Sequence, residues 1–298
     1  MNRHLKGVNG SGTPYHSGER EVQRLVGRAE EAAEVGRTVS RIISLGASRF
    51  LARQRLAVSA SLDAAGRPWA SLLTGPMGFV RPVDERLLRI AVSPGAGDPL
   101  ADNLAVRPEL ALLVLDPRTR QRMRFNGRGL ARPEGVFLLT DQAYGNCPKY
   151  IQMRRLVGEN TVAPGAPTRR QCLDRRQQDF VAEADTLFIA SFHPEGGADA
   201  SHRGGRPGFV RVESGRRLSI PDYPGNNMFN TLGNLAGYPR AGLLFVDFGG
   251  GAVLQLTGRA TLHTAPERCL SLDIEEVRET RDGCPLRWEL VEYSPSNP

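Results

Sequence analysis

Residues 208–211 read Gly-Phe-Val-Arg, and the same four residues stand at positions 78–81. A shift of 130 residues superposes the two stretches and brings further identical residues together. These pairs include Ala60-Ser61 with Ala190-Ser191, Ala70-Ser71 with Ala200-Ser201, and Pro94-Gly95 with Pro224-Gly225. After one inserted residue, the register continues with Leu112-Leu113 on Leu243-Leu244 and Gly127-Arg128 on Gly258-Arg259. So many matches in one register, over about 80 residues, predict a tandem duplication of one unit.

Short apolar runs separated by turn residues make each unit rich in predicted strands. In the first unit we expect strands at Leu56–Leu62, Trp69–Thr74, Gly78–Arg81, Leu87–Val92, Leu110–Asp116 and Arg122–Leu130. A helix is expected between the fourth and fifth strands of each unit. Parallel winding would need a helix after nearly every strand, so an antiparallel barrel with a few helices fits better. The predicted fold class is mainly β with helices (α+β), built as two tandem barrels.

The remaining segments surround and join the two units. Residues 1–18 are rich in Gly, Ser and Pro and are expected to form an arm that is partly disordered or ordered on contact. Helices are expected at Glu19–Arg37, Ser48–Arg55, Asp141–Val157 and Thr168–Ala184, with a Pro/Gly linker at 163–167 and a last strand at Pro285–Tyr293. The expected domains are an N-terminal arm and helix (1–48), unit one with its following helix (49–160) and unit two (168–298).

Composition narrows the class of protein. The chain has 298 residues, is 40% hydrophobic and has a mean hydropathy of -0.33, so it can bury a core. No apolar run approaches the roughly 18 residues of a membrane span, and no apolar segment follows the N-terminus as in a signal peptide. We therefore expect a cytoplasmic protein that is not in a membrane.

The net charge of +7 comes from arginine, because Lys6 and Lys149 are the only lysines. The arginines are interleaved with acids, as in Glu19-Arg20-Glu21, which is typical of a solvated surface. We expect no nucleic-acid partner. The four cysteines, Cys147, Cys172, Cys269 and Cys284, lack CxxC spacing and a His at metal-ligand distance. They are expected to be free thiols, without a metal site.

The stretch Pro224–Leu235 is the first candidate for a binding site. It follows a strand-like run at 217–221 and is expected to form a Pro-Gly turn and then a helix. A helix would place Met228, Leu232 and Leu235 on one apolar face, and Asn227, Asn230, Thr231 and Asn234 on a polar, uncharged face. Free backbone N–H groups in such a first turn suit a phosphate. The alternative is that Asn226 or Asn227 simply caps the helix.

Several spaced motifs resemble the pyridoxamine-5′-phosphate-oxidase-like, FMN-binding split β-barrel flavoproteins. The motifs are Ala200–Val210, Ile220-Pro221-Asp222, Gly225-Asn226-Asn227, Pro239–Phe245 and Leu256–Ala260. The resemblance covers about residues 50–290. It implies that Ser201, His202 and Arg203 contact the FMN phosphate, with Arg206 assisting. Asn227, Asn230 and Thr231 replace the family's Ser-Arg-Lys triplet, and Asn234 stands where the family has a flavin-contacting Gln.

The two units differ at these positions. Unit one has Ser71-Leu72-Leu73 opposite Ser201-His202-Arg203, without a cation. It has Ala96-Gly97-Asp98 opposite Asn226-Asn227-Met228, and the acid there would repel a phosphate. Unit two is therefore expected to bind the nucleotide, with unit one as a scaffold.

Family members are usually homodimers with flavin at the interface, and a tandem chain can form that dimer within itself. The segment Tyr144–Arg155 is the candidate from unit one. It puts Cys147, Lys149 and Tyr150 at an expected helix start, and these are the predicted catalytic residues. The alternative is a structural helix beginning at a Pro with a buried Cys. His16 is expected either to fold over the pocket or to mark a helix start.

The resemblance implies an FMN-dependent oxidoreductase acting on a small organic molecule. The chain ends without a ferredoxin-reductase-like module, so electrons are expected from a separate reductase, reduced nicotinamide or the substrate. The alternatives are a non-catalytic flavin-binding redox protein, or a member using F420 or haem, the latter with His16, His202 or His263 as axial ligand. Further pairing of tandem chains into a homodimer is left open.

Overall fold

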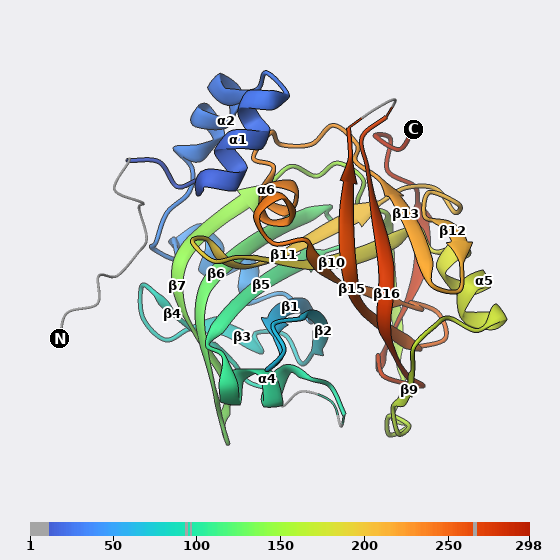
Figure 1. Ribbon diagram of the computed structural model, residues 1–298. Coiled ribbons are helices and arrows are strands. Elements are labelled where there is room, and N and C mark those ends of the chain that lie inside the picture. The colour runs from blue at the N-terminus through green and yellow to red at the C-terminus, as the bar shows by residue number, and fades with distance from the viewer. Residues whose placement is uncertain (1–11, 93–94, 96, 265–266) are drawn as a thin grey trace.

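The computed structural model describes residues 12–92, 95, 97–264 and 267–298 (Figure 1). Pro94 and Ala96, which belong to the aligned repeat positions, lie outside these residues, as do residues 1–11 of the expected arm. Two large antiparallel sheets dominate the fold, and we call the half with the first sheet barrel one and the half with the second barrel two. The two sheets have the same strand order, which confirms the tandem duplication.

The first sheet has the order β2-β1-β5-β6-β7-β4-β3. Its strands are β1 (Leu56–Leu62), β2 (Pro68–Thr74), β3 (Val80–Pro82), β4 (Leu87–Ile90), β5 (Glu109–Asp116), β6 (Gln121–Arg132) and β7 (Gly135–Asn146). The second sheet has the order β11-β10-β14-β15-β16-β13-β12. Its strands are β10 (Thr186–His193), β11 (Gly197–Gly204), β12 (Arg211–Ser214), β13 (Arg217–Pro221), β14 (Arg240–Val246), β15 (Val253–His263) and β16 (Cys269–Thr280). The mainly β, tandem split-barrel fold is therefore confirmed.

A helix lies between the fourth and fifth strands of each sheet, as expected. These helices are α4 (Leu100–Val106) in barrel one and α6 (Asn230–Gly237) in barrel two. The short strand β9 (Thr168–Arg170) pairs with β16, and α5 (Arg175–Glu183) follows it. The expected helix at 168–184 is thus shorter, because Asp174 caps α5 with its side chain and fixes the helix start.

The two barrels share a hydrophobic core along β1 and β10. Val58 and Ala60 of β1 pack with Phe188 and Ala190 of β10 in this shared core. Ala57, which directly precedes Val58, faces the separate core of barrel one. Because neighbouring side chains on a strand point to opposite faces, β1 is buried on both sides and joins the barrels.

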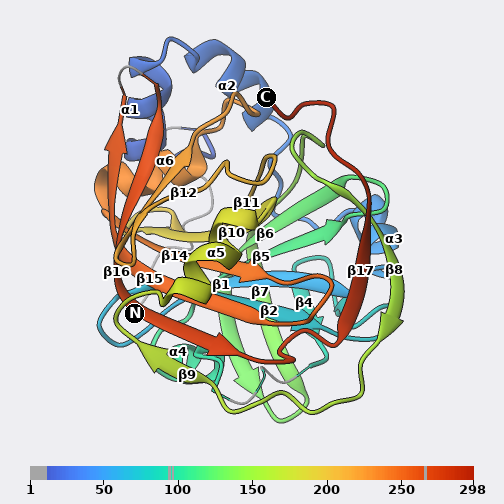
Figure 2. The same cartoon turned by 90° about the vertical axis from the view of Figure 1, so that its right-hand side faces the viewer.

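The predicted helix at 141–157 is wrong. Strand β7 continues to Asn146 and pairs with β6, so that Ala143 lies opposite Phe125 and Asn146 opposite Arg122. A loop follows, and β8 (Met153–Glu159) then pairs with the last strand, β17 (Leu286–Glu292). Figure 2 shows β8 and β17 side by side as a separate ribbon. Backbone pairing across the sheet outweighs local helix propensity here.

The N-terminal helices also differ from the expectation. Helix α1 (Ser17–Leu25) and helix α2 (Ala29–Gly36) replace a single helix at 19–37, because Gly27 between them has a φ of +66°. Helix α3 (Leu45–Leu51) begins earlier than expected, where the Ser44 side chain caps it. Helix α1 packs against α6, and Figure 1 shows this pair at one end of the sheets.

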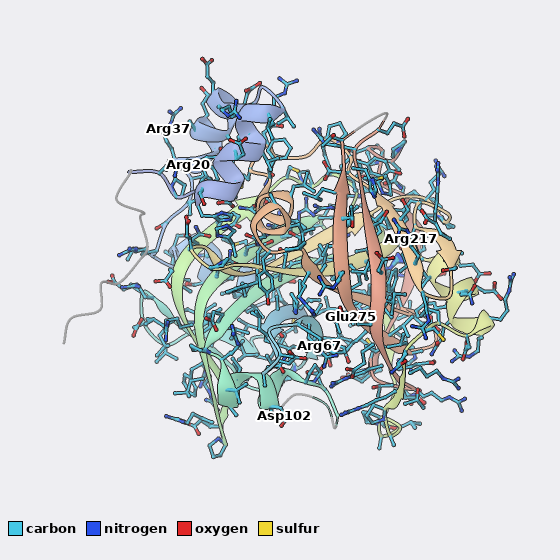
Figure 3. All side chains as sticks on the ribbon, viewed as in Figure 1. Arg20, Arg37, Arg67, Asp102, Arg217 and Glu275 are labelled. Carbon is cyan, nitrogen blue, oxygen red and sulfur yellow. The ribbon has the colours of Figure 1, made fainter. Side chains whose placement is uncertain are left out.

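None of the described helices is long and apolar enough to cross a membrane. The described residues contain no group of three or more metal-binding side chains, and all four cysteines are unpaired. Figure 3 shows its labelled charged residues dispersed, with Arg20 and Arg37 on the N-terminal helices and Arg217 and Glu275 on barrel two. The domain bounds given above stay a prediction.

Candidate functional site

A cavity of about 70 Å³ lies between the start of α6, the end of β11 and strand β6 of barrel one. Its walls are formed by the residues Arg122, Arg124, Asn146, Tyr150, Ser201, His202, Arg203, Gly204, Phe209, Pro221, Asp222, Tyr223, Gly225, Asn226, Asn227, Phe229, Asn230, Thr231 and Leu232. Both barrels therefore contribute to one cavity.

Helix α6 begins at this cavity, five residues after Gly225 of the Pro-Gly turn. Asn227 and Phe229 both have left-handed φ values, 60° and 59°, and Phe229 is the residue before the helix. Among the described residues no side chain caps α6, so the alternative that Asn226 or Asn227 caps the helix is wrong. Asn226 instead accepts a hydrogen bond from the Met228 N–H at 3.2 Å and donates to the Asn146 side chain of barrel one. The uncapped first turn retains N–H groups that can bind an anion.

Two arginines of barrel one reach the cavity from β6. Arg122 is only 8% exposed; its Nη1 lies 3.0 Å from His202 Nδ1, and its Nη2 lies 3.7 Å from Cys147 Sγ. Arg124 donates through Nη1 to Asp199 at 3.0 Å and to the Asn230 side chain at 3.2 Å. Because these arginines are two residues apart on a strand, both point to the same face of the sheet.

Positive charge exceeds negative charge in this cavity. Arg124 is paired with Asp199, and Arg203 lies 3.7 Å from Asp222. Among the described residues, no carboxylate is paired with Arg122. Burial and, to a smaller extent, the nearby Arg124 lower the pKa of Arg122 to about 10. A buried, unpaired guanidinium is costly, and a bound anion would compensate it.

His202 stays neutral beside these arginines. Burial lowers the pKa of His202 well below its ordinary value, and Arg122 and Arg203 lower it further. Its Nε2 atom and the Nε atom of Arg122 are buried, and neither has a hydrogen-bond partner among the residues that the structure describes. Buried polar atoms are normally paired, so these two atoms mark a place for a polar ligand or water.

Hydroxyl and carboxylate groups link β11 to α6 along the cavity wall. The Thr231 hydroxyl donates to Ser201 Oγ at 2.9 Å, and the Ser201 hydroxyl donates to Asp199 at 2.9 Å. Asp199 in turn accepts from Arg124. This chain of contacts fixes the first turn of α6 against the strand that carries His202 and Arg203.

Helix α1 holds α6 from the opposite side. The buried Glu19 accepts a hydrogen bond from the Asn230 side chain at 2.5 Å and one from the His16 backbone N–H at 2.9 Å. His16 caps α1, its Nε2 lies 2.8 Å from Asn234 Oδ1, and its ring stacks on His193 at 3.9 Å. The N-terminal arm is therefore part of the support of the site, and His16 has the helix-start role.

The buried position of Glu19 leads us to expect that the stability of the chain depends on pH. Burial raises the pKa of Glu19 to about 8. The folded chain thus retains a proton that the unfolded chain loses above about pH 4.5, so stability falls as the pH rises toward 8. Burial also lowers the pKa of His16 to about 4, which affects stability below pH 6.5. Between pH 6.5 and 8, we therefore expect the free energy of unfolding to fall in the natural chain.

Glu19→Gln is expected to remove this slope, because the amide carries no charge and can keep the contact with Asn230. Urea denaturation at pH 6.5 and pH 8 measures it. Glu21→Gln, on the exposed side of the same helix, serves as the control and should keep the natural slope. If the free energy of unfolding of Glu19→Gln fell between pH 6.5 and pH 8 as much as that of the natural chain, Glu19 would not be the titrating group.

Most predicted cofactor-binding residues line the cavity. These are Ser201, His202, Arg203, Asn226, Asn227, Asn230 and Thr231, together with the predicted catalytic residue Tyr150. Tyr150 has a φ of +67°, and its hydroxyl donates to the Pro224 carbonyl at 2.9 Å. The Tyr150 ring lies 5.3 Å from the ring of Tyr223, so two aromatic side chains meet beside the cavity.

Four predicted residues lie outside the cavity wall. Asn234 is buried between His16 and Ser191, to which its amide donates at 2.9 Å. Arg206 lies over the ring of Tyr293. Lys149 is exposed, and Cys147 contacts Arg122 from beyond the cavity wall. The expected helix start at Cys147–Tyr150 is a loop, so it offers these residues no helix N-terminus.

The corresponding place in barrel one is filled by Asp98. This carboxylate accepts from the Leu100 N–H at the start of α4 at 2.9 Å and from the Gln255 side chain at 3.0 Å. Gln255 is the repeat counterpart of Arg124. Burial raises the pKa of Asp98 to about 6, while the hydrogen bonds from Leu100 and Gln255 oppose that shift. The Asp98 carboxylate is thus an anion of the chain itself that occupies the start of α4.

The sequence interpretation missed Arg122, Arg124, Asp199 and Glu19. Arg122 and Arg124 stand two residues apart inside a strand that the sequence does predict, at 122–130. Two charges on one face of a largely buried strand are a signal that could have identified them. Glu19 carries no such signal, because its burial depends on the docking of α1 on α6.

Comparisons with known proteins agree with this duplicated fold. The family model described as Pyridoxamine 5'-phosphate oxidase matches residues 47–146 and 173–280. A solved structure of HupZ from Group A Streptococcus, the H111A variant, is 16% identical, with a TM-score of 0.28 over 35% of this chain and 99% of that chain. A structure titled F420 Reductase is 13% identical, with a TM-score of 0.23 over 34% of this chain and 93% of that chain. At these TM-scores, neither likeness supports an inference about function. No curated protein matches the chain.

Proposed function

Because the chain belongs to the pyridoxamine 5′-phosphate oxidase family, we propose that it binds FMN in the cavity at α6 and is an FMN-dependent oxidoreductase. Its substrate would be a small organic molecule. Electrons would come from a separate reductase, reduced nicotinamide or the substrate itself. Bound FMN supplies the capacity to accept and donate a hydride.

The excess of buried positive charge is the observation that carries the proposal. Arg122, Arg124 and Arg203 provide three guanidinium groups around the cavity, whereas Asp199 and Asp222 provide two carboxylates. Since His202 is neutral, the missing negative charge suits a phosphate group. The uncapped first turn of α6 adds backbone N–H groups at the same place.

The residues present fit the phosphate of FMN. Arg122 and Arg203 would bind it from opposite barrels, and the Thr231 hydroxyl with the first turn of α6 would complete the contacts. Arg124 would act through Asn230 and Asp199, because its guanidinium is occupied by them. Tyr150 and Tyr223 would cover the cavity and keep water from a bound ligand, with Tyr150 held by Pro224.

The visible absorption spectrum of the purified protein tests the assignment, before and after addition of FMN. We expect a flavin band that stays with the protein through gel filtration and is lost in Arg203→Ala. Bleaching of that band by an added electron donor, and its return with an acceptor, would support the oxidoreductase over a non-catalytic flavin protein. A colourless protein that takes up no FMN would contradict the proposal, and a haem or F420 spectrum would replace it.

One FMN per chain is the expected stoichiometry. Barrel one fills its corresponding place with Asp98, which already accepts the hydrogen bonds of Leu100 and Gln255. An FMN phosphate there would meet the Asp98 carboxylate, which would repel it. Titration with FMN at a known protein concentration should therefore saturate at one equivalent. Saturation at two equivalents would show that barrel one also binds the cofactor.

A further inference from the structure

Cys147 lies directly behind the cavity wall, at the end of β7. Its side chain is partly exposed, and its Sγ atom accepts a hydrogen bond from Arg122 Nη2 at 3.7 Å. Arg122 also lines the cavity and contacts His202 there. A change at the sulfur atom would therefore act on a cation of the proposed phosphate site.

The surroundings of Cys147 are typical of a reactive cysteine. Reactive cysteines are partly exposed and lie among positive charges. Arg122 has no carboxylate partner among the described residues, and its Nε atom is buried without any partner. Arg124 and Arg203 add positive charge close enough to lower the pKa of Arg122.

The other cysteines lack this combination. Cys284 is fully buried, and burial raises its pKa to about 11, which disfavours the reactive thiolate. Cys172 is exposed and Cys269 is partly buried. Among the described contacts, neither of these two accepts a hydrogen bond from an arginine.

We propose that Cys147 is a redox modification site, at which hydrogen peroxide weakens anion binding in the cavity. The sulfur attacks one peroxide oxygen, so an S–O bond forms and the O–O bond breaks. The sulfur loses two electrons, the peroxide gains them, and the leaving hydroxide takes the thiol proton to become water. The product is a cysteine sulfenic acid, which a thiol can reduce again.

The added oxygen competes with the ligand for Arg122. The oxygen of the sulfenic acid is a stronger hydrogen-bond acceptor than the sulfur atom itself. A guanidinium beside the sulfenic acid also favours the ionised form of that acid. Arg122 is the one cation of the cavity that lacks a carboxylate partner among the described residues. Its charge is then neutralised by the oxidised Cys147 and no longer by a ligand in the cavity. This inference depends on the proposed function only for the identity of the anion.

The neighbours of Cys147 connect the modification to the cofactor loop. Asn146, the preceding residue, accepts a hydrogen bond from Asn226. Tyr150, three residues later, donates to the Pro224 carbonyl. Both partners belong to the loop that precedes α6, so a shift of Cys147 would disturb two hydrogen bonds of that loop.

The test treats the full chain with hydrogen peroxide, traps sulfenic acid with dimedone and locates the adduct by peptide mass. We expect Cys147 to be labelled faster than Cys172, and Arg122→Gln to slow its labelling. In the treated natural chain, the Kd for FMN should rise about tenfold and recover with dithiothreitol. Cys147→Ser should show the same Kd before and after peroxide, whereas Cys172→Ser should behave like the natural chain.

The labelling measurement needs no flavin and separates this inference from the proposed function. If no variant binds FMN, faster labelling that depends on Arg122 still supports a redox site, and the proposed function fails alone. Equal labelling of Cys147 and Cys172 would overturn the redox site. An equal loss of FMN affinity in Cys147→Ser would overturn the link between the thiol and the anion site.

Discussion

Arg122→Met is expected to weaken FMN binding by about 10- to 150-fold, because it removes charge-assisted hydrogen bonds worth about 1.5–3 kcal/mol. The same change should raise the free energy of unfolding of the ligand-free protein by about 1 kcal/mol, since it removes a buried guanidinium that no carboxylate compensates. Opposite effects on ligand affinity and on stability are expected of a residue that binds a ligand at a cost to the stability of the ligand-free protein. FMN titration and urea denaturation measure the two effects.

Arg128→Met is the matched control for this prediction. Arg128 lies on the same strand, β6, but its side chain is exposed. Its replacement should change FMN affinity and stability by no more than about 0.5 kcal/mol. Unchanged FMN affinity in Arg122→Met, or an equal loss in Arg128→Met, would show that Arg122 does not hold the phosphate.

Gly233→Ala is expected to destabilise the chain by about 1–3 kcal/mol and to lower FMN affinity. A Cβ atom at Gly233 would lie 2.6 Å from the Cα atom of Glu19, closer than real contacts allow. Gly18 of α1 likewise leaves no room for a side chain against the Gly233 carbonyl. Helix α1 would have to move away from α6 and release the contacts of Glu19 with Asn230.

Gly46→Ala in α3 is the control that tests whether the expected effect of Gly233→Ala comes from packing and not from helix propensity. The nearest atom to a Cβ at Gly46 is Ser44 Oγ at 3.7 Å, an ordinary contact. Because alanine favours a helix, this variant should gain up to about 1 kcal/mol and keep FMN affinity. Thermal unfolding and FMN titration of both variants decide the point. A stable Gly233→Ala with normal FMN affinity would exclude α1 as a support of the site.

Much of the fold could be predicted from the sequence, because the repeat doubles every local signal. Strand β1 has the predicted bounds, Leu56–Leu62, and the helix between the fourth and fifth strands is present in both barrels. The error at 141–157 arose where local propensity favoured a helix and pairing with β6 decided for a strand. Strand pairing between distant residues is not visible in a short window of sequence.

Apart from Tyr150, the part of the cavity that could be predicted is its barrel-two half. Ser201, His202, Arg203 and Thr231 lie close together in sequence motifs, and the structure places them in one wall. Arg122 comes from the other barrel, and its contact with His202 joins residues 80 positions apart. Asn234, which is predicted to contact the cofactor, contacts His16 in the structure, and the position of His16 depends on the docking of α1. Contacts between elements that are distant in sequence determine where these residues lie, and only the folded chain shows those contacts.

The most direct test of the phosphate site is to titrate the full chain with FMN and with riboflavin, which lacks the phosphate. If Arg122, Arg203 and the first turn of α6 bind the phosphate, FMN should bind about 100-fold more tightly than riboflavin. It should also saturate at one equivalent per chain, and Arg203→Ala should bring the two affinities close together. Equal affinity of the natural chain for FMN and riboflavin would contradict the phosphate site, and no binding of either would contradict the flavin assignment itself.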